Sequence, residues 1–249
     1  MIITVITVCL NSEKTIEQTI RSVIGQTYNN IEYIIWDGGS TDSTIDIVEK
    51  FLENNKNIKL YRGVDSGPGD AFNKSIELAK GDIVGFLASD DIYYNESVLE
   101  DIFFKFKENN SLGAVYGDIV YQNKSGAISR KWITGKYSED SFLNGWAIPF
   151  PSFYFKREYY SLYGGMDLDM DIADDFDLIL RYVFVNKIKI LYINKTMIIF
   201  SSTGRSSSIF ARFKSLNEIL YSFKKYNIKI NLFNYVFKRY LAKIKQLFI

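Results

Sequence analysis

The chain contains no histidine in its 249 residues. This absence excludes histidine bases, histidine-containing catalytic triads and histidine metal ligands, so any catalysis has to use carboxylates, hydroxyls, amines or a metal ion. The single cysteine, Cys9, lies in an apolar run, where a thiol is usually a small buried residue. One cysteine permits no disulfide framework, and we expect a reducing compartment.

Long apolar runs are also missing. No run approaches the roughly 18 residues that a membrane-spanning helix requires, and the first residues form a strand pattern instead of a basic leader with a cleavage site. We therefore expect a cytoplasmic protein. With 47% apolar and 24% charged residues, the composition is typical of a folded globular chain.

Acidic residues are scarce near the end of the chain. The formal net charge is +1, but residues 205–249 contain ten Lys and Arg residues and a single acid, Glu218. The preceding part of the chain therefore carries a net negative charge. A basic segment behind an acidic body suits an anionic surface, so we expect a membrane surface, and no nucleic acid, as the partner of this tail.

The first 94 residues predict three repeats of a strand followed by a helix, and then a fourth strand. Apolar runs at 2–10, 31–36 and 58–61 are typical of strands that are buried on both faces. Each run precedes a segment whose apolar residues recur at helical spacing. Three such repeats imply a right-handed, mostly parallel α/β sheet of the nucleotide-binding type.

The fourth strand leads directly into Asp90 and Asp91. Open α/β sheets bind ligands at the carboxyl edge of their strands, and hard divalent cations prefer carboxylate oxygens. The pair is therefore a candidate metal site. The alternative is that it caps the helix expected from about Asn95, because acids are common before helices.

Two further loops at the same edge combine acids with glycines. Asp37 opens the turn 37–42, and Asp65 opens the loop 65–70. Backbone N–H groups beside carboxylates suit ribose hydroxyls, base N–H groups and a metal-bound diphosphate. Each loop alone can equally be an ordinary turn, but the three together predict one ligand crevice.

The second half of the chain predicts antiparallel pairing. The pattern indicates a helix after Asn95, a hairpin at 114–121 and 127–133, a strand at 152–156, a helix to Tyr163, and closing strands at 188–193 and 197–200. An acidic segment then leads into an apolar helix; its acids are Asp167, Asp169, Asp171, Asp174, Asp175 and Asp177. Like charges at this density must be solvated, cap a helix or pair with cations. The functional candidates are the pair at the start of the helix, Asp174 and Asp175.

The tail predicts two helices. Before them, residues 201–208 form a hydroxyl-rich segment in which Arg205 is placed to close over phosphates or belongs to a plain linker. The last helical pattern has an apolar stripe with basic residues beside it. Such a helix lies on an anionic membrane, or it packs on the domain or on a second subunit as a homodimer.

Together these motifs resemble the large family-two type of inverting nucleotide-sugar glycosyltransferases with a GT-A fold, whose bacterial members build surface polysaccharides. The resemblance runs from Ile2 to about Ile199 and rests on the segments 5–11, 26–28, 37–42, 65–67, 73–74, 81–82, 90–91 and 173–178. It implies a Rossmann-like, mixed but mainly parallel sheet with helices on both faces. It also divides the chain into a domain at 1–204, with a nucleotide-binding half at 1–94 and an acceptor-side half at 95–204, and a tail at 205–249.

The resemblance implies a role for each candidate residue. Asp90 would bind Mn²⁺ or Mg²⁺, and Asp175, next to Asp174, would be the catalytic base. The remaining candidates would contact the nucleotide-sugar, and these are Thr7, Val8, Asn11, Asp37, Gly38, Asp65, Ser66, Gly67, Asn73, Ser89, Asp91 and Arg205. Of these, Asp37, Asp65 and Asn73 would hold the nucleoside.

The chain departs from the family pattern at three places. Ala88 replaces the first acid of the Asp-x-Asp metal motif, although the metal ligand Asp90 is present. Gly38 stands where many members carry an acid that contacts the nucleobase, so the nucleotide is left open between UDP and GDP. No basic residue is found near 149–151, where members often have one.

The implied function is metal-dependent, inverting transfer of a sugar from a UDP- or GDP-sugar to a glycan hydroxyl. The acceptor would be lipid-linked, at the inner face of the cytoplasmic membrane. Two alternatives stay open. A nucleotidyltransferase acting on sugar phosphates would need a basic glycine-rich loop where this chain has Asn11, Ser12 and Glu13, and an inactive nucleotide-sugar-binding module would have lost acids such as Asp90 and Asp175.

Overall fold

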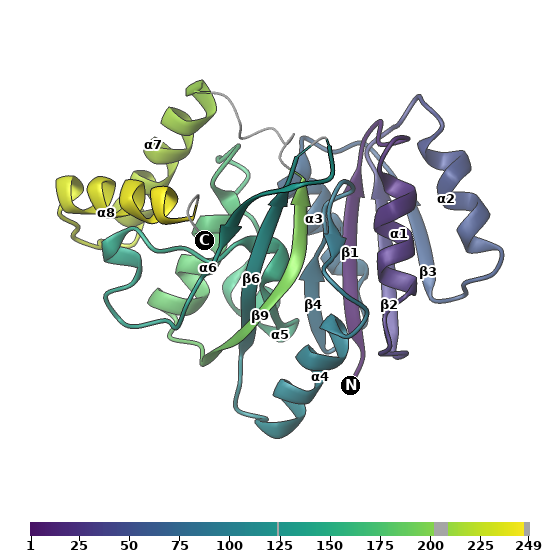
Figure 1. Cartoon of the computed structure of the whole chain (residues 1–249), viewed down its shortest axis with the longest axis horizontal. Helices are drawn as coiled ribbons and strands as arrows, with labels where there is room; N and C mark the ends of the chain where they lie inside the picture. Colours follow the sequence, from purple (N-terminus) through teal and green to yellow (C-terminus); the bar gives the residue numbers. More distant parts are fainter. Residues whose placement is uncertain (124, 202–208, 247–249) are drawn as a thin grey trace.

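The computed structural model describes residues 1–123, 125–201 and 209–246. Its centre is a mixed sheet with the strand order β3-β2-β1-β4-β8-β6-β9-β5, and β7 pairs with β6 (Figure 1). The parallel part consists of β1 (Ile3–Cys9), β2 (Ile31–Asp37), β3 (Ile58–Arg62) and β4 (Ile83–Phe86). This arrangement confirms the predicted nucleotide-binding type of sheet.

Three helices connect the parallel strands, and they are α1 (Ile16–Ile24), α2 (Thr44–Leu52) and α3 (Pro68–Leu78). Helix α1 explains the helical spacing of apolar residues in the sequence, because Ile16, Ile20 and Val23 lie on one face and are all fully buried. Helix α3 begins at Pro68, inside the segment 65–70 that the sequence analysis treats as a loop. Pro68 stands in its first turn, where a missing backbone N–H costs no hydrogen bond.

The second half adds antiparallel pairs. Strand β8 (Tyr154–Lys156) runs antiparallel to both β4 and β6 (Ala114–Gln122), and β6 forms a hairpin with β7 (Ile128–Trp132). Strand β5 (Ile92–Tyr93) runs antiparallel to β9 (Ile190–Ser201). The helical elements of this half are α4 (Val98–Glu108), η1 (Phe142–Asn144), η2 (Phe150–Ser152), α5 (Glu158–Tyr163), α6 (Asp174–Leu180) and η3 (Arg181–Val185).

The prediction of two closing strands at 188–193 and 197–200 was wrong, because the structure has the single strand β9. The polar residues at 194–196 indicated a break. In the structure they remain within β9, which pairs parallel with β6 through register shifts on either side of Asp118. Because the register is irregular here, the polar residues 194–196 remain part of β9 between its apolar ends.

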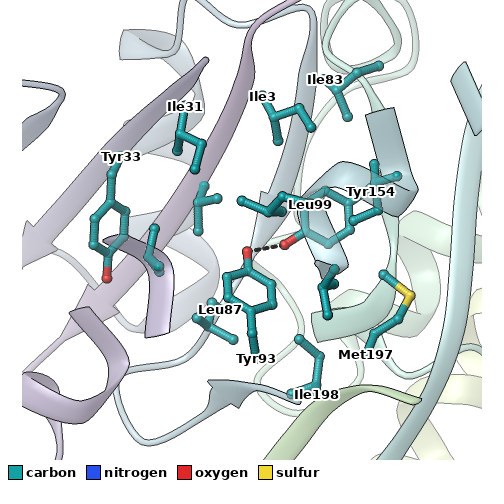
Figure 2. Close-up of a cluster of buried hydrophobic side chains, with 14 of the residues drawn as sticks. Ile3, Ile31, Tyr33, Ile83, Leu87, Tyr93, Leu99, Tyr154, Met197 and Ile198 are labelled. Atoms are coloured by element: carbon teal, nitrogen blue, oxygen red, sulfur yellow. Dashed lines mark hydrogen bonds between the residues drawn. The ribbon is translucent and has the colours of Figure 1, made fainter. Parts of the chain in front are cut away.

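Apolar side chains pack on both faces of the sheet. On the face covered by α1 and α4, Figure 2 shows Tyr93 and Tyr154 with their hydroxyl groups directed toward one another between apolar neighbours. These two hydroxyl groups form a hydrogen bond, which satisfies both polar groups inside the core. The other face is covered by α3, α6 and the C-terminal helices.

The C-terminal helices α7 (Ile209–Lys225) and α8 (Leu232–Lys245) belong to this second core. Phe223 of α7 is almost fully buried, and its ring centroid lies 5.7 Å from that of Phe176 and 5.4 Å from that of Tyr235 in α8. Glu218 accepts hydrogen bonds from the backbone N–H groups of residues 171–173. One face of the tail therefore packs on the domain, and the proposed boundary at 204/205 stays a prediction about sequence organisation.

Cations from α7 explain much of the acidic segment. Lys225 Nζ lies 2.7 Å from Asp167 Oδ2 and 3.6 Å from Asp177 Oδ2. Lys214 Nζ lies 2.7 Å from Asp171 Oδ2. The expected pairing with cations is therefore confirmed for Asp167, Asp171 and Asp177. Asp174 and Asp175 stand in the first turn of α6.

We expect the change Phe223→Ala to lower the free energy of unfolding by about 3–5 kcal/mol, as for other buried aromatic residues. The matched control is Phe213→Ala on the same helix, where the side chain is 67% exposed and the expected change is within about 0.5 kcal/mol. Urea unfolding of both variants measures the difference. Equal stabilities would mean that α7 does not contribute to the core.

Candidate functional site

The candidate residues gather at the carboxyl edge of the parallel strands. In the pairing register, Cys9 at the end of β1 lies opposite Asp37, and Asp37 lies opposite Arg62 at the end of β3. The three strands therefore end level with one another. The loops that follow them lie side by side, as the sequence predicted.

Side-chain hydrogen bonds join the loop after β1 to the loop after β2. The fully buried Asp37 accepts hydrogen bonds through Oδ2 from the backbone N–H groups of Gly39 and Ser40, both at 3.0 Å. Asn11 accepts one from the backbone of Thr41 at 2.9 Å, and its own N–H donates to Ser40 Oγ at 2.8 Å. These carboxylate and amide groups give the turn a fixed shape.

Asp65 fills the space beside Gly38. Asp65 Oδ2 accepts a hydrogen bond from Trp36 Nε1, and Oδ1 accepts one from the backbone of Gly67, both at 3.0 Å. A Cβ atom at position 38 would lie only 2.7 Å from Asp65 Oδ2. A larger residue at position 38 would therefore displace Asp65. The next residue, Ser66, is exposed and donates to Asp70.

Three other candidates, Thr7, Val8 and Asn73, lie in the strand β1 and the helix α3 beside these loops. Thr7 is fully buried, and its hydroxyl donates to Leu87 O at 2.7 Å and accepts from Tyr33 at 3.0 Å. The Asn73 amide accepts from Met166 N–H at 2.8 Å and donates to Met166 O at 2.9 Å. Val8 is partly buried in β1. Direct contact of these residues with a ligand stays a prediction.

Asp91 is fully buried and only half satisfied. Its Oδ1 accepts a hydrogen bond from Ser201 N–H at 3.0 Å, whereas Oδ2 has no partner among the residues that the structure describes. Burial, reinforced by the charge of Asp90, raises the pKa of Asp91 well above its usual range. Asp90 is partly exposed, and burial also raises its pKa, against a hydrogen bond with Ser201.

The capping explanation for this acid pair was wrong. Helix α4 begins at Val98, with Ser97 as its N-cap residue, and Asn95 Oδ1 accepts the Ser97 N–H at 3.0 Å. Asp91 instead faces the end of β9. The neighbouring Ser89 lies 2.8 Å from Ser12, hydroxyl to hydroxyl, which joins this loop to the one after β1.

The acid pair fits a cation that arrives with a phosphate ligand. Within 1–123, 125–201 and 209–246 no three His, Cys, Asp or Glu residues form a ready-made metal cluster. A cation that a diphosphate carries needs only one or two protein carboxylates. Asp90, which is partly exposed, and the unpartnered Oδ2 of the adjacent Asp91 supply such oxygens.

The start of α6 lies against the first turn of α3. A Cβ atom at position 69 would overlap the Asp174 carboxylate, so the two segments meet at a glycine. Asp175 Oδ1 accepts the N–H of Phe176 at 2.6 Å. Burial, followed by the charge of Asp174, raises the pKa of Asp175 to about 7. A carboxylate with this pKa can exchange a proton near neutral pH.

The structure therefore brings most candidates to one edge. Tyr121 of β6 feels both acid pairs: burial raises its pKa, the charge and hydrogen bond of Arg130 lower it, and the charges of Asp91 and Asp175 raise it further. Sequence reasoning missed Tyr121, Ser12 and Trp36 as members of this site, and no local motif marks them. Arg205 lies outside the described residues.

The profile of glycosyl transferase family 2 matches residues 4–161, which is more than half of the chain. The chain belongs to glycosyl transferase family 2. The matched residues include the loops of Asp37, Asp65 and Asp90, whereas Asp174 and Asp175 lie beyond the match.

Similar proteins support the same family and fold. The chain is 35% identical over 103 residues, or 41% of both chains, to the UDP-Glc:alpha-D-GlcNAc-diphosphoundecaprenol beta-1,3-glucosyltransferase WfaP of Escherichia coli. Other curated glycosyltransferases that it matches are covered over 50% to 66% of their length. The chain thus spans 41% to 66% of the length of these relatives.

Two solved structures share the GT-A fold with this family 2 member. TarS of S. aureus in complex with UDP-GlcNAc has a TM-score of 0.72 at 20% identity, covering 96% of this chain and 69% of TarS. The mannosyltransferase PcManGT of Pyrobaculum calidifontis, in complex with GDP-Man and Mn²⁺, has a TM-score of 0.68 at 20% identity, covering 90% and 63%. In the described part of this chain, no helix has the length and apolarity needed to span a membrane.

Proposed function

We propose that this family 2 protein transfers a sugar from a UDP- or GDP-sugar to a hydroxyl group of a glycan, with inversion at the anomeric carbon. One observation carries the proposal: Asp175, whose pKa is raised to about 7, lies at the same edge as the acid pair after β4 and the glycine loop after β3. A base, a diphosphate site and a nucleoside site would then be adjacent.

The donor would bind across the parallel strands. Asp37 and Asp65 would hold the nucleoside through the loops described above, with Asn11 and Asn73 supporting those loops. The names of similar proteins support either nucleotide, because WfaP is named for UDP-Glc and PcManGT was solved with GDP-Man. Asp90, with Asp91 behind it, would hold Mn²⁺ or Mg²⁺. Such an ion would neutralise charge on the departing nucleotide diphosphate.

Asp175 would act as the base. As the acceptor oxygen forms its bond to the anomeric carbon, its proton moves to the Asp175 carboxylate. The bond from the anomeric carbon to the phosphate oxygen breaks on the opposite face, and the nucleotide leaves with that electron pair. Attack from the opposite face inverts the configuration. A base whose pKa lies near the working pH is efficient because it is both ionised and sufficiently basic.

The alternatives have less support. In a nucleotidyltransferase the loop after β1 would face phosphates with basic groups, but here Glu13 accepts a hydrogen bond from the Ser43 backbone at 3.2 Å. An inactive binding module would have no need of a carboxyl group with a raised pKa. The acids at both ends of the proposed reaction path are present.

We also propose that the protein acts at the inner face of the cytoplasmic membrane on a lipid-linked acceptor. WfaP is named for an acceptor linked to diphosphoundecaprenol. On α8, Phe233 is 82% exposed, Phe237 and Tyr240 are also exposed, and the Phe233 and Phe237 rings stack at 6.2 Å. The basic residues of the tail complement an anionic lipid surface, which makes that surface the occupant of this apolar face.

We expect Asp175→Asn to lower the transfer rate by about 10²–10⁴-fold, because the amide has the size of the acid without its basicity. Donor affinity should stay the same. In the unaltered chain, the rate should rise as the pH increases through about 7, since the base must be ionised. Steady-state rates across pH and the anomeric configuration of the product by NMR test this; a retained configuration would exclude the proposed mechanism.

Asp90→Ala should remove the metal-dependent part of nucleotide binding while leaving the protein folded. The matched control is Asp46→Ala, which removes an exposed acid from α2. Calorimetric titration with UDP and with GDP, each with and without Mn²⁺, measures the effect. If Asp90→Ala and the control bind UDP–Mn²⁺ and GDP–Mn²⁺ equally well, the metal assignment is wrong.

The protein should co-sediment with vesicles that contain anionic lipid, and binding should weaken with salt, because the attraction acts within about 10 Å at 0.1 M ionic strength. Phe233→Glu together with Phe237→Glu should abolish binding. Leu162→Glu on α5, where the leucine is 64% exposed, is the matched control. Retained binding by the double variant would place the membrane contact elsewhere.

A further inference from the structure

A basic cavity lies on the acceptor side of the molecule, apart from the donor loops. It has a volume of about 220 Å³ and is formed by strand β7, the segment 133–147 and helix α8. Its charged and aromatic lining consists of Arg130, Trp132, Trp146, Arg239, Lys243 and Lys245. We call it the basic pocket. No acid is among the described residues that line it.

The walls of the basic pocket are held in place by close packing. A Cβ atom at Gly145 would lie 2.7 Å from Arg239 N and 2.8 Å from Tyr235 O, so α8 rests directly on this turn. Lys238 Nζ donates to Asn144 Oδ1 at 2.7 Å, and Lys131 N–H donates to Gln246 O at 3.2 Å. The cations of α8 and β7 are therefore fixed close to one another.

The cations of the pocket act on one another, and the described residues that line it include no acid. Partial desolvation of its ammonium group, followed by the charges of Arg239, Arg130 and Arg212, lowers the pKa of Lys243 to about 8. The Arg130 guanidinium lies 3.6 Å from the centroid of the Tyr121 ring, while its Nε is buried without a hydrogen-bond partner among the described residues. The buried Gln246 also lines the cavity, and in the same described part of the chain its Oε1 has no partner.

The basic pocket borders the proposed base. Arg239 is one of the charges that act on Asp175, and it lowers the pKa of that carboxyl. Tyr121, against which Arg130 stacks, also responds to the charge of Asp175. In the sheet, β7 and β8 lie on the same edge of β6, opposite β9. Helix α8, which forms the other side of the pocket, lies at the opposite end of the molecule from α2 (Figure 1).

We propose that the basic pocket binds the phosphate or diphosphate group through which the acceptor sugar is joined to its carrier. This inference rests on the proposed glycosyltransferase function. Guanidinium and ammonium groups bind phosphate oxygens through charge-assisted hydrogen bonds, and Trp132 and Trp146 offer flat apolar surfaces for the adjoining sugar or prenyl chain. Such a site would present the acceptor hydroxyl to Asp175 from the side opposite the donor.

The geometry of α8 supports a carrier that is a lipid. The helix directs Tyr235, Arg239, Ala242 and Gln246 toward the protein and the pocket, at intervals of three and four residues. Phe233, Phe237 and Tyr240 follow the same spacing and are exposed, so they lie on the other face of the helix. One helix would therefore rest on the membrane and also hold the charged group at the membrane surface.

Tryptophan fluorescence gives a direct test in the full chain. The protein has three tryptophans, two of which line the basic pocket, whereas Trp36 contacts Asp65 in the donor half. In a Trp36→Phe background, the remaining signal reports on the pocket. Farnesyl diphosphate, titrated without nucleotide or metal, should change this fluorescence, and farnesol should not. An equal response to farnesol would reduce the pocket to an apolar cavity and overturn the proposal.

Charge-removing variants identify the residues responsible. Arg130→Gln and Lys243→Ala should each weaken the binding of farnesyl diphosphate by about tenfold, the effect of losing one charge-assisted hydrogen bond. Lys224→Ala removes one exposed charge from the neighbouring helix α7 and is the matched control. Circular dichroism of each variant checks that it is folded. Equal affinities for the variants and the control would overturn the proposal.

Competition distinguishes the possible sources of the phosphate group. Farnesyl diphosphate should bind more tightly than inorganic diphosphate, and vesicles with phosphatidylglycerol should not displace it. Equal affinity for inorganic diphosphate would make the pocket a free-anion site, and displacement by the vesicles would make it a lipid-headgroup site; either result overturns the acceptor assignment. Binding of UDP–Mn²⁺ or GDP–Mn²⁺ is measured separately, so failure of the pocket is distinguishable from failure of the glycosyltransferase assignment.

Discussion

Ion pairs join the acidic segment 167–177 to helix α7. This contact positions the part of the molecule that bears Asp175, the proposed base. Lys225 contacts Asp167 and Asp177, and Lys214 contacts Asp171. Surface ion pairs taken singly contribute little to stability, but here they accompany the burial of Phe223. The pairing fixes the start of α6, which bears Asp175. Helix α8 in turn packs on Asn144 and Gly145.

The same arrangement gives Asp175 its unusual environment. Burial and the adjacent Asp174 disfavour the ionised form, and Arg239 of α8 partly offsets them. Because the folded-state pKa of about 7 lies above the usual carboxyl value, ionisation of Asp175 opposes folding. Its contribution to stability is therefore full below about pH 4 and is lost as the pH rises through about 7. An ionised Asp175 therefore lowers the stability of the fold, and the packing of α7 and α8 on the domain offsets this loss.

The donor half could be predicted closely from the sequence, because its signals are local. Uninterrupted apolar runs identified the parallel strands. Asp37 is the last residue of β2, Asp65 follows the end of β3 by three residues, and Asp90 follows the end of β4 by four. The acceptor side could not be predicted in the same way. The proximity of Ser201 to Asp91 joins residues 110 positions apart. The single strand β9 depends on an irregular register with β6, for which the polar residues at 194–196 are a misleading signal.

Donor recognition and acceptor recognition are therefore encoded differently along the chain. The family profile covers residues 4–161, so it includes the turns that would recognise a nucleotide but neither Asp175 nor the tail. Donor recognition needs a fixed set of short turns around a diphosphate, which the chain encodes locally. Acceptors differ in sugar and carrier, and their contacts come from helices that approach the sheet only through tertiary packing. The basic pocket illustrates this, because Arg130 and Lys243 are more than a hundred residues apart and meet only because Gly145 admits α8. Specificity for the acceptor would therefore reside in residues that only tertiary packing brings together, such as Arg130 of β7 and Lys243 of α8, where the sequence signal is weakest and the structure is most informative.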